Sequence, residues 1–251
     1  MSRPQHLCIR PLNVRDVPQV LGLEILGFPP NERASALRIE YRLTTCPELC
    51  SGLFIREFDT DAISGTEPSK HSTIKNETLI GHIIATKMLS DTVVDESMEV
   101  PSDFVSVMCN PDGTLKEKYK TERLRQLEEE DKNKEHEKHD EHDEQETEDH
   151  DLKNNKVIGN VDAGKTIGIH SVVIDPKYQG MKLGALLLKD YIQKMSQQYV
   201  AETIALLCKE KLIKFYSSVG FTDKGISECR FGGEEWHDMS IVLEHEEDDE
   251  D

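Results

Sequence analysis

The apolar positions along the chain follow two periods, one of two residues and one near 3.6 residues. Runs with the shorter period predict strands, and runs with the longer period predict helices. Val17, Val20, Leu21 and Ile25, for example, share one face of a helix that begins near Val14. We expect strands over residues 6–12, 50–57, 78–88, 166–174, 203–208 and 236–243, and helices over 14–26, 34–45, 184–198 and 209–218.

The order of these elements predicts one mixed α/β sheet flanked by helices. Two polar segments interrupt the pattern, residues 59–75 and residues 112–156. The second is almost wholly charged and cannot bury enough apolar surface to offset the entropy of ordering, so we expect it to be disordered, with at most a frayed helix over 116–130. We therefore expect a single domain over 1–243, interrupted by this insertion, and an acidic tail over 244–251.

The net charge of −19 is concentrated in two places. Residues 129–151 contain 13 acidic residues and 3 lysines, and residues 244–251 contain 7 acidic residues, so the rest of the chain is close to neutral. Recognition of nucleic acid would require a basic patch, and none is evident. The charge pattern therefore excludes a nucleic-acid partner, and no obligate protein partner is evident either.

Several further classes are disfavoured. The six cysteines form no CxxC pair, and no secretory segment is evident, which predicts reduced thiols and a cytoplasmic location. No apolar run approaches the roughly 18 residues of a membrane helix. Four histidines lie inside the acidic insertion, where exposed imidazoles among acids are more often solvated than metal-bound, so we expect no metal site.

The most informative stretch joins the strand 166–174 to the helix 184–198. An Asp-Pro pair ends the strand, and a short turn containing Gly180 leads into the helix. A helix N-terminus offers unpaired amides and a positive dipole end, which suits a phosphate group. The turn lacks the GxxxxGK[ST] pattern of a nucleotide-triphosphate loop, and the chain has no GxGxxG with an early βαβ unit, so neither ATP nor NAD is favoured.

The turn resembles the pyrophosphate signature [Q/R]-x-x-G-x-[G/A] of the GNAT superfamily of acetyl-CoA-dependent N-acyltransferases. The six positions are Gln179, Gly180, Met181, Lys182, Leu183 and Gly184. Lys182 replaces the first signature glycine, but any residue except proline can supply an amide in the helical region. The Lys182 ammonium either reaches a phosphate of CoA or remains a solvated surface group, and the sequence leaves both open.

Three segments carry a closer resemblance, residues 41–54, 168–179 and 205–221. Together they are similar to the serotonin (arylalkylamine) N-acetyltransferase family, and the loop 27–35 is similar to its fungal branch, for which polyamines are also named as substrates. The resemblance implies the GNAT fold, acetyl-CoA as co-substrate and transfer of an acetyl group to a primary amine by direct attack. It implies cofactor contacts from Val172, Val173, Ile174, Gln179, Gly180, Met181, Lys182, Leu183, Gly184 and Ala185.

The reaction requires a base for the ammonium proton and an acid for the leaving thiolate. His170, on the strand before the turn, is the candidate base, and Tyr216 is the candidate acid. The family carries two histidines here, and Gly168 takes the place of the first, so His170 would act alone. Both side chains also have a structural interpretation, as a hydrogen-bonded sheet histidine and a packed aromatic ring. Cys208 is expected to be a buried structural thiol rather than a nucleophile.

The amine pocket is expected at the loop 27–35. Phe28, Pro29 and Pro30 would form a rigid apolar wall, and Glu24 or Glu32 would attract a cation. This composition suits both arylalkylamines and polyamines. A plain loop before a helix remains the alternative interpretation for the two glutamates.

Two other functions compete with this one. The same fold would serve a protein N-terminal or lysine acetyltransferase if an open groove replaced the pocket. A non-catalytic CoA-binding protein with acidic recruitment segments is the second alternative, and Lys182 and Gly168 are the departures from the family pattern that would favour it.

Overall fold

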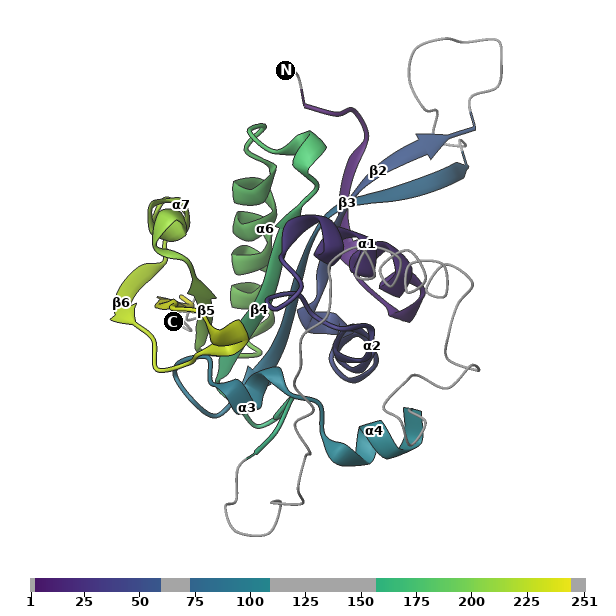
Figure 1. Cartoon of the computed structure of the whole chain (residues 1–251). Coiled ribbons are helices and arrows are strands. Elements are labelled where there is room, and N and C mark those ends of the chain that lie inside the picture. Colours follow the sequence, from purple (N-terminus) through teal and green to yellow (C-terminus); the bar gives the residue numbers. More distant parts are fainter. Residues whose placement is uncertain (1–2, 60–72, 109–156, 245–251) are drawn as a thin grey trace, which may run out of the picture.

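The structure of the protein, a computed structural model, describes residues 3–59, 73–108 and 157–244 (Figure 1). The expectations for the insertion 112–156, including its frayed helix, and for the tail beyond Glu244 lie outside the described residues. None of the helices in the described part of the chain is long and apolar enough to span a membrane.

Seven strands form one twisted mixed sheet in the order β1-β2-β3-β4-β5-β7-β6. All neighbours are antiparallel except β4 and β5, which are parallel. The strands are β1 (Leu7–Pro11), β2 (Ser51–Phe58), β3 (Ile74–Met88), β4 (Thr166–Ile174), β5 (Thr203–Cys208), β6 (Thr222–Ile226) and β7 (His237–Val242). The helices are α1 (Val17–Gly27), α2 (Ala36–Thr45), α3 (Asp95–Met98), α4 (Ser102–Met108), α6 (Leu183–Gln198) and α7 (Ile213–Ser217).

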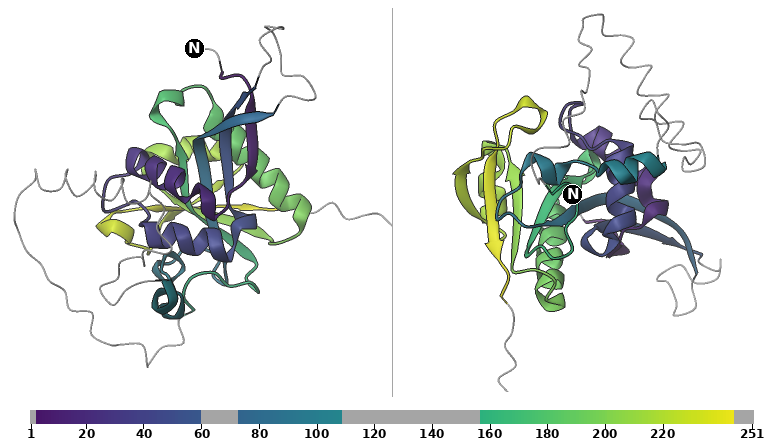
Figure 2. Two further views of the ribbon diagram at one scale, coloured as in Figure 1. Left: turned by 90° about the vertical axis from the view of Figure 1, so that its right-hand side faces the viewer. Right: turned by 90° about the horizontal axis from the view of Figure 1, so that it is seen from below.

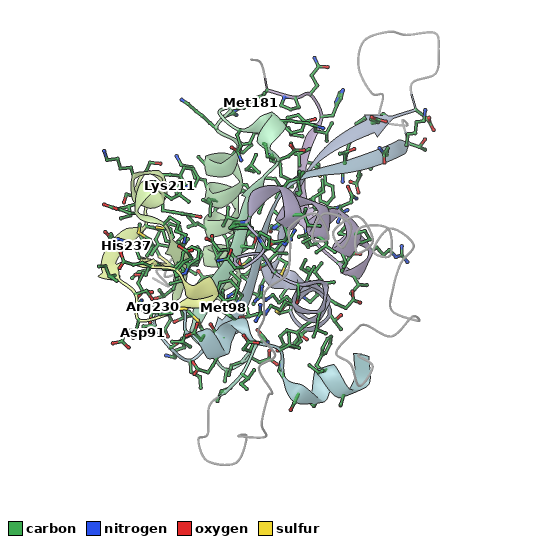
Figure 3. All side chains as sticks on the ribbon, viewed as in Figure 1. Asp91, Met98, Met181, Lys211, Arg230 and His237 are labelled. Atoms are coloured by element: carbon green, nitrogen blue, oxygen red, sulfur yellow. The ribbon has the colours of Figure 1, made fainter. Side chains whose placement is uncertain are left out.

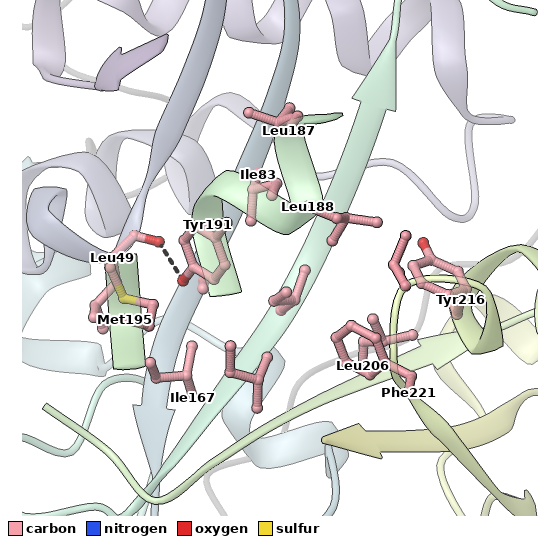
Figure 4. Close-up of a cluster of buried hydrophobic side chains, with 14 of the residues drawn as sticks. Leu49, Ile83, Ile167, Leu187, Leu188, Tyr191, Met195, Leu206, Tyr216 and Phe221 are labelled. Atoms are coloured by element: carbon pink, nitrogen blue, oxygen red, sulfur yellow. Dashed lines mark hydrogen bonds between the residues drawn. The ribbon is translucent and has the colours of Figure 1, made fainter. Parts of the chain in front are cut away.

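Helices cover both faces of the sheet: α1 and α2 pack on one face and α6 on the other (Figure 2). Alternating side chains of the central strands supply both cores, because successive residues of a strand point to opposite faces. Ile83 packs with Leu187 on the α6 side, whereas the next residue, Ile84, packs with α1 and α2. The hydroxyl of Tyr191 on α6 is also satisfied, since it donates to the carbonyl oxygen of Leu49 at 2.8 Å (Figure 4).

The predicted fold class is confirmed, and so are all six predicted strands and three of the four predicted helices. The region 209–218 forms a short 3₁₀ turn followed by α7 rather than one continuous helix. The strand β6 was missed because its sequence, TDKGI, has no apolar alternation: it is an edge strand whose one large apolar residue, Ile226, is 60% exposed. The short helices α3 and α4 were missed as well.

Candidate active site

A cavity opens where β4 and β5 separate. The two strands pair only from Thr166–Thr203 to Ile169–Leu206, and both continue beyond that point without pairing to each other. The cavity has a volume of about 650 Å³. Its walls are formed by the ends of β4 and β5, the loop after α1, the segment leading into α7 and the loop before β7. The divergence of the central strands therefore creates a site that both helical layers can reach.

His170 is placed on this cavity by a β-bulge. Ile84 of β3 pairs with Ser171, and Ala85 pairs with Ile169, so His170 is the extra residue on β4. A bulge redirects the side chain of the unpaired residue, and bulges are common beside active sites. Gly168 lies earlier on the same strand, and a Cβ atom there would approach the Met88 sulfur at 2.9 Å. A second histidine at this position would therefore require the Met88 side chain to shift.

Both ring nitrogens of His170 have protein partners. Nε2 lies 2.7 Å from the hydroxyl of Thr86, and Nδ1 lies 2.8 Å from the sulfur of Met98. Burial lowers the pKa of His170 well below 6.5, and the nearby guanidinium groups of Arg42 and Arg38 lower it further. The imidazole is therefore neutral at pH 7 and able to accept a proton, although it is a weak base.

Tyr216 lies in the same cavity, and its ring packs between two phenylalanines. The ring centroids are 5.1 Å from Phe215 and 5.8 Å from Phe221, in edge-to-face geometry. In Figure 4 the hydroxyl points away from Phe221 and Leu206. Burial raises the pKa of Tyr216, and the nearby Cys208 raises it further, so the phenol keeps its proton. Cys208 is 1% exposed with a pKa raised to about 11 by burial and by Asp223, which agrees with a structural thiol.

The residues expected in the amine pocket divide into two groups. Phe28, Pro29 and Glu32 line the cavity. Pro30 is exposed and is not among the lining residues, and Glu24 is 1% exposed and faces the interior. The predicted cation attraction can therefore come directly from Glu32, whereas Glu24 has no open face toward a ligand.

Glu24 instead organises a buried polar network behind the cavity. One of its carboxylate oxygens lies 2.9 Å from His82 Nε2 and accepts a hydrogen bond from the hydroxyl of Ser171, and the other accepts from the amide of Ala34 at 2.8 Å. Burial raises the pKa of Glu24, but the hydrogen bonds from these three groups outweigh it and the pKa is lowered. The Glu24 carboxylate thus connects three parts of the chain. These are β3, the part of β4 next to His170, and the end of the loop 27–35.

We expect Glu24→Ala to lower the free energy of unfolding by about 2 kcal/mol at pH 7, because it leaves buried donors without an acceptor. A group with a lowered folded pKa contributes its stability above its unfolded value, here 4.5, and the contribution is lost as pH falls. The difference between wild type and variant should therefore shrink below pH 4.5. Denaturant titration at several pH values measures this, with the exposed Glu57→Ala as a control that should change stability by less than about 0.5 kcal/mol. A pH-independent difference would contradict the ionised state of Glu24.

The predicted phosphate turn has the form that an anion site requires. The amide of Leu186 makes the first helical hydrogen bond, to Lys182, so the amides of Leu183, Gly184 and Ala185 precede it and have no partner within the helix. Among residues 3–59, 73–108 and 157–244, no side chain caps this end of α6. Met181, labelled in Figure 3, marks the turn, and its carbonyl accepts a hydrogen bond from Arg3 at 3.2 Å. The amides and the dipole of a 16-residue helix therefore remain available to a phosphate.

The backbone at Lys182 differs from the expectation. Its φ of 60° and ψ of 23° lie in the left-handed region rather than the right-handed helical region. A side chain costs on the order of 1 kcal/mol in this conformation, and glycine avoids that cost. The expectation of a helical conformation at this position is therefore wrong: a glycine would suit this turn because of the sign of φ, and Lys182 adopts it at a cost.

The remaining cofactor candidates lie on or beside the same turn. Val172 lines the cavity, Val173 is buried against α1 and α2, and Ile174 ends β4. Beyond Ile169, the backbone of β4 has no strand partner on its β5 side within the described sheet. The side chain of Gln179 donates to the carbonyl oxygen of Ile174 at 3.0 Å and so closes the turn onto the strand.

Sequence reasoning missed side chains that line the cavity from distant segments, among them Met98, Lys209, Glu234 and Trp236, and it missed Thr86, which contacts His170 from behind the cavity wall. Only one of them carried a usable signal. Trp236 is the only tryptophan of the chain and begins the last predicted strand. The others are ordinary polar or apolar residues whose proximity depends on how the loops pack.

Comparison with known proteins identifies the family. A sequence profile described as an acetyltransferase (GNAT) domain matches residues 115–243. The chain is also 33% identical over 72 residues to the uncharacterized N-acetyltransferase ycf52 of Pyropia yezoensis. That match covers 27% of this chain and 41% of the relative, so the chain spans about two fifths of the length of this curated protein.

Two solved structures share the fold. The loading GNATL domain of CurA from Lyngbya majuscula superposes with a TM-score of 0.55 at 13% identity, covering 95% of this chain and 98% of that one. The GphF GNAT-like decarboxylase, described in complex with isobutyryl-CoA, gives a TM-score of 0.51 at 12% identity, covering 94% and 100%. At these identities the likeness concerns the fold alone. With the profile matching half of the sequence, and with β4 diverging from β5 and leading into α6, the chain belongs to the GNAT acetyltransferase family.

Proposed function

We propose that the protein transfers the acetyl group of acetyl-CoA to the primary amine of a small arylalkylamine or polyamine. The observation that carries this proposal is that one cavity holds both His170 and Tyr216 together with the wall residues Phe28, Pro29 and Glu32. The resemblance of residues 41–54, 168–179 and 205–221 to the serotonin (arylalkylamine) N-acetyltransferase family supports this substrate class.

The unpaired amides of α6 fit the diphosphate of CoA, and the family supports acetyl-CoA as the co-substrate. Leu183, Gly184 and Ala185 would hold it through their amides, with Gln179 shaping the turn. Acetyl-CoA supplies, when bound, the thioester carbonyl that an amine can attack.

The two candidate catalytic groups have protonation states suited to their roles. His170 is neutral at pH 7 and takes the proton of the substrate ammonium, while the contact of Nε2 with Thr86 holds its ring in place. Tyr216 keeps its phenolic proton and donates it to the leaving thiolate. Both steps use side chains of this chain within one cavity, so a covalent enzyme intermediate at the buried Cys208 is unnecessary.

Contacts between the two loops that line the cavity favour a small amine over a protein substrate. The side chain of Asn31 donates to the carbonyl oxygen of Gly232 at 2.8 Å and joins the two loops that line the cavity. Lys209 also joins them, through Glu32 and Glu234. A groove for a peptide would require these two loops to stand apart.

We further propose that residues 1–243 form one catalytic domain interrupted by the insertion 112–156, and that the protein acts in the cytoplasm.

A substrate panel tests the proposal. With acetyl-CoA, we expect kcat/KM for tryptamine, phenethylamine or spermidine to exceed that for peptides with a free N-terminus or a lysine by at least about tenfold, read as thiol release. Higher rates with peptides would assign the cavity to a protein acetyltransferase. CoA binding without thiol release from any acceptor would support the non-catalytic alternative.

A further inference from the structure

The cavity already contains an ammonium group, which belongs to the chain itself. Lys209 follows β5 directly, and its Nζ atom lies 3.1 Å from Glu32 and 2.9 Å from Glu234. The same atom lies 4.1 Å from the centroid of the Trp236 ring. Two carboxylates and an indole ring therefore surround one cation: Glu32 comes from the loop after α1, and Glu234 and Trp236 come from the loop before β7.

This arrangement differs from an ordinary surface ion pair. The side chains of Lys209 and Glu32 are only 24% and 12% exposed, and that of Glu234 is 46% exposed, whereas the pair Lys165–Glu202 is 76% and 61% exposed and involves a single carboxylate. Burial lowers the pKa of Lys209, but its hydrogen bonds to Glu234 and Glu32 outweigh that effect and raise it. The site is thus built to hold a charged ammonium group, by ion pairing and by a cation–π contact.

The charge of the cavity wall is not balanced by lysine. Four glutamates line the cavity, whereas Lys209 and Lys211 are the only lysines among the lining residues that the structure describes. Any molecule that fills the cavity therefore meets both excess negative charge and the apolar surface of Phe28 and Pro29. Such a wall attracts cations that also carry hydrocarbon.

We propose that Lys209 is a specificity-determining residue that occupies a second ammonium site formed by Glu32, Glu234 and Trp236. This inference rests on the proposed transfer to small amines. A diamine or polyamine places one amine at the reaction centre and a second ammonium elsewhere in the cavity. Lys209 competes with that second ammonium, so the wild-type protein favours monoamines more than its acidic cavity would otherwise allow.

The test compares amines that differ only in the second ammonium. A series of α,ω-diamines, such as 1,8-diaminooctane, is assayed beside monoamines of equal length, such as octylamine. We expect Lys209→Met, which keeps the aliphatic stem and removes the charge, to raise the ratio of kcat/KM for diamine over monoamine by about tenfold at the best chain length. The length of that best diamine reports the distance between the two amine sites.

Two controls assign the effect to the site rather than to total charge. Lys211→Met makes the same change of charge on an exposed lysine of the cavity rim, labelled in Figure 3, and should alter the ratio less than about twofold. Adding Glu234→Gln to Lys209→Met removes one carboxylate of the site and should abolish most of the gain. If Lys209→Met fails to fold, Lys209→Gln provides the same test.

Failure of this inference can be distinguished from failure of the proposed function. If amines are acetylated but the ratio is the same in wild type and Lys209→Met, the second ammonium site is refuted and the proposed function stands. If no variant acetylates any amine, the proposed function is refuted. Calorimetric titration with 1,8-diaminooctane then decides the site by itself: about tenfold tighter binding to Lys209→Met supports it, and equal binding overturns it.

Discussion

Replacing Gly184 with glutamate is expected to weaken the binding of acetyl-CoA by more than about 100-fold. Gly184 lies in the first turn of α6, where the unpaired amides and the positive end of the helix dipole meet. A Cβ atom there would already lie 3.2 Å from the ring of Phe215, so we expect a larger side chain to turn away from this ring and toward the anion site. The glutamate carboxylate would then take the place of the diphosphate and repel it.

Calorimetric titration with CoA measures this effect directly. Gly184→Ala serves as the steric control and should cost much less, because a methyl group requires a shift of only a few tenths of an ångström from Phe215. Lys182→Gly should change the affinity less than about tenfold, and it should raise the melting temperature by relieving the left-handed backbone at that position. Unchanged affinity in Gly184→Glu would place the cofactor elsewhere.

The second large effect concerns His170. We expect His170→Gln to lower turnover about 100-fold at neutral pH, with recovery as alkaline pH deprotonates the amine itself. Because the pKa of His170 is lowered, the imidazole remains unprotonated as pH falls through 6.5. The acid limb that His170 contributes to kcat/KM of the wild type should therefore lie well below pH 6.5 rather than near it.

Tyr216→Phe gives the matched comparison. Turnover should fall by a similar order, but with little recovery at high pH, since the leaving thiolate still lacks its acid. Both variants should keep their affinity for acetyl-CoA, because neither side chain lies in the turn at the start of α6. Profiles of kcat/KM against pH for the wild type and both variants separate the two roles. Wild-type rates for His170→Gln at low pH, where an amine most needs a base, would refute the assignment of His170.

Much of the fold could be predicted from local pattern. The unit β4–turn–α6 was found from the sequence with bounds within one residue, because a β-branched run, an Asp-Pro break and leucines at helical spacing all act over short distances. The edge strand β6 escaped prediction for the opposite reason, since an exposed edge strand needs no apolar face. Lys182 shows the same limit within a turn, because spacing identified the position but not the sign of its φ angle.

The candidate site likewise has parts that local sequence predicts and parts that depend on the packing of the domain. His170, Tyr216 and the turn before α6 could be predicted as candidates from the sequence, since each lies in a short recognisable segment. The burial of Glu24 beside His82, the bulge that presents His170 and the place of Lys209 on the acidic side of the cavity became evident only in the folded domain. These outcomes depend on strand register and on contacts between loops far apart in sequence. Such contacts arise from packing of the whole domain, which local periodicity does not encode.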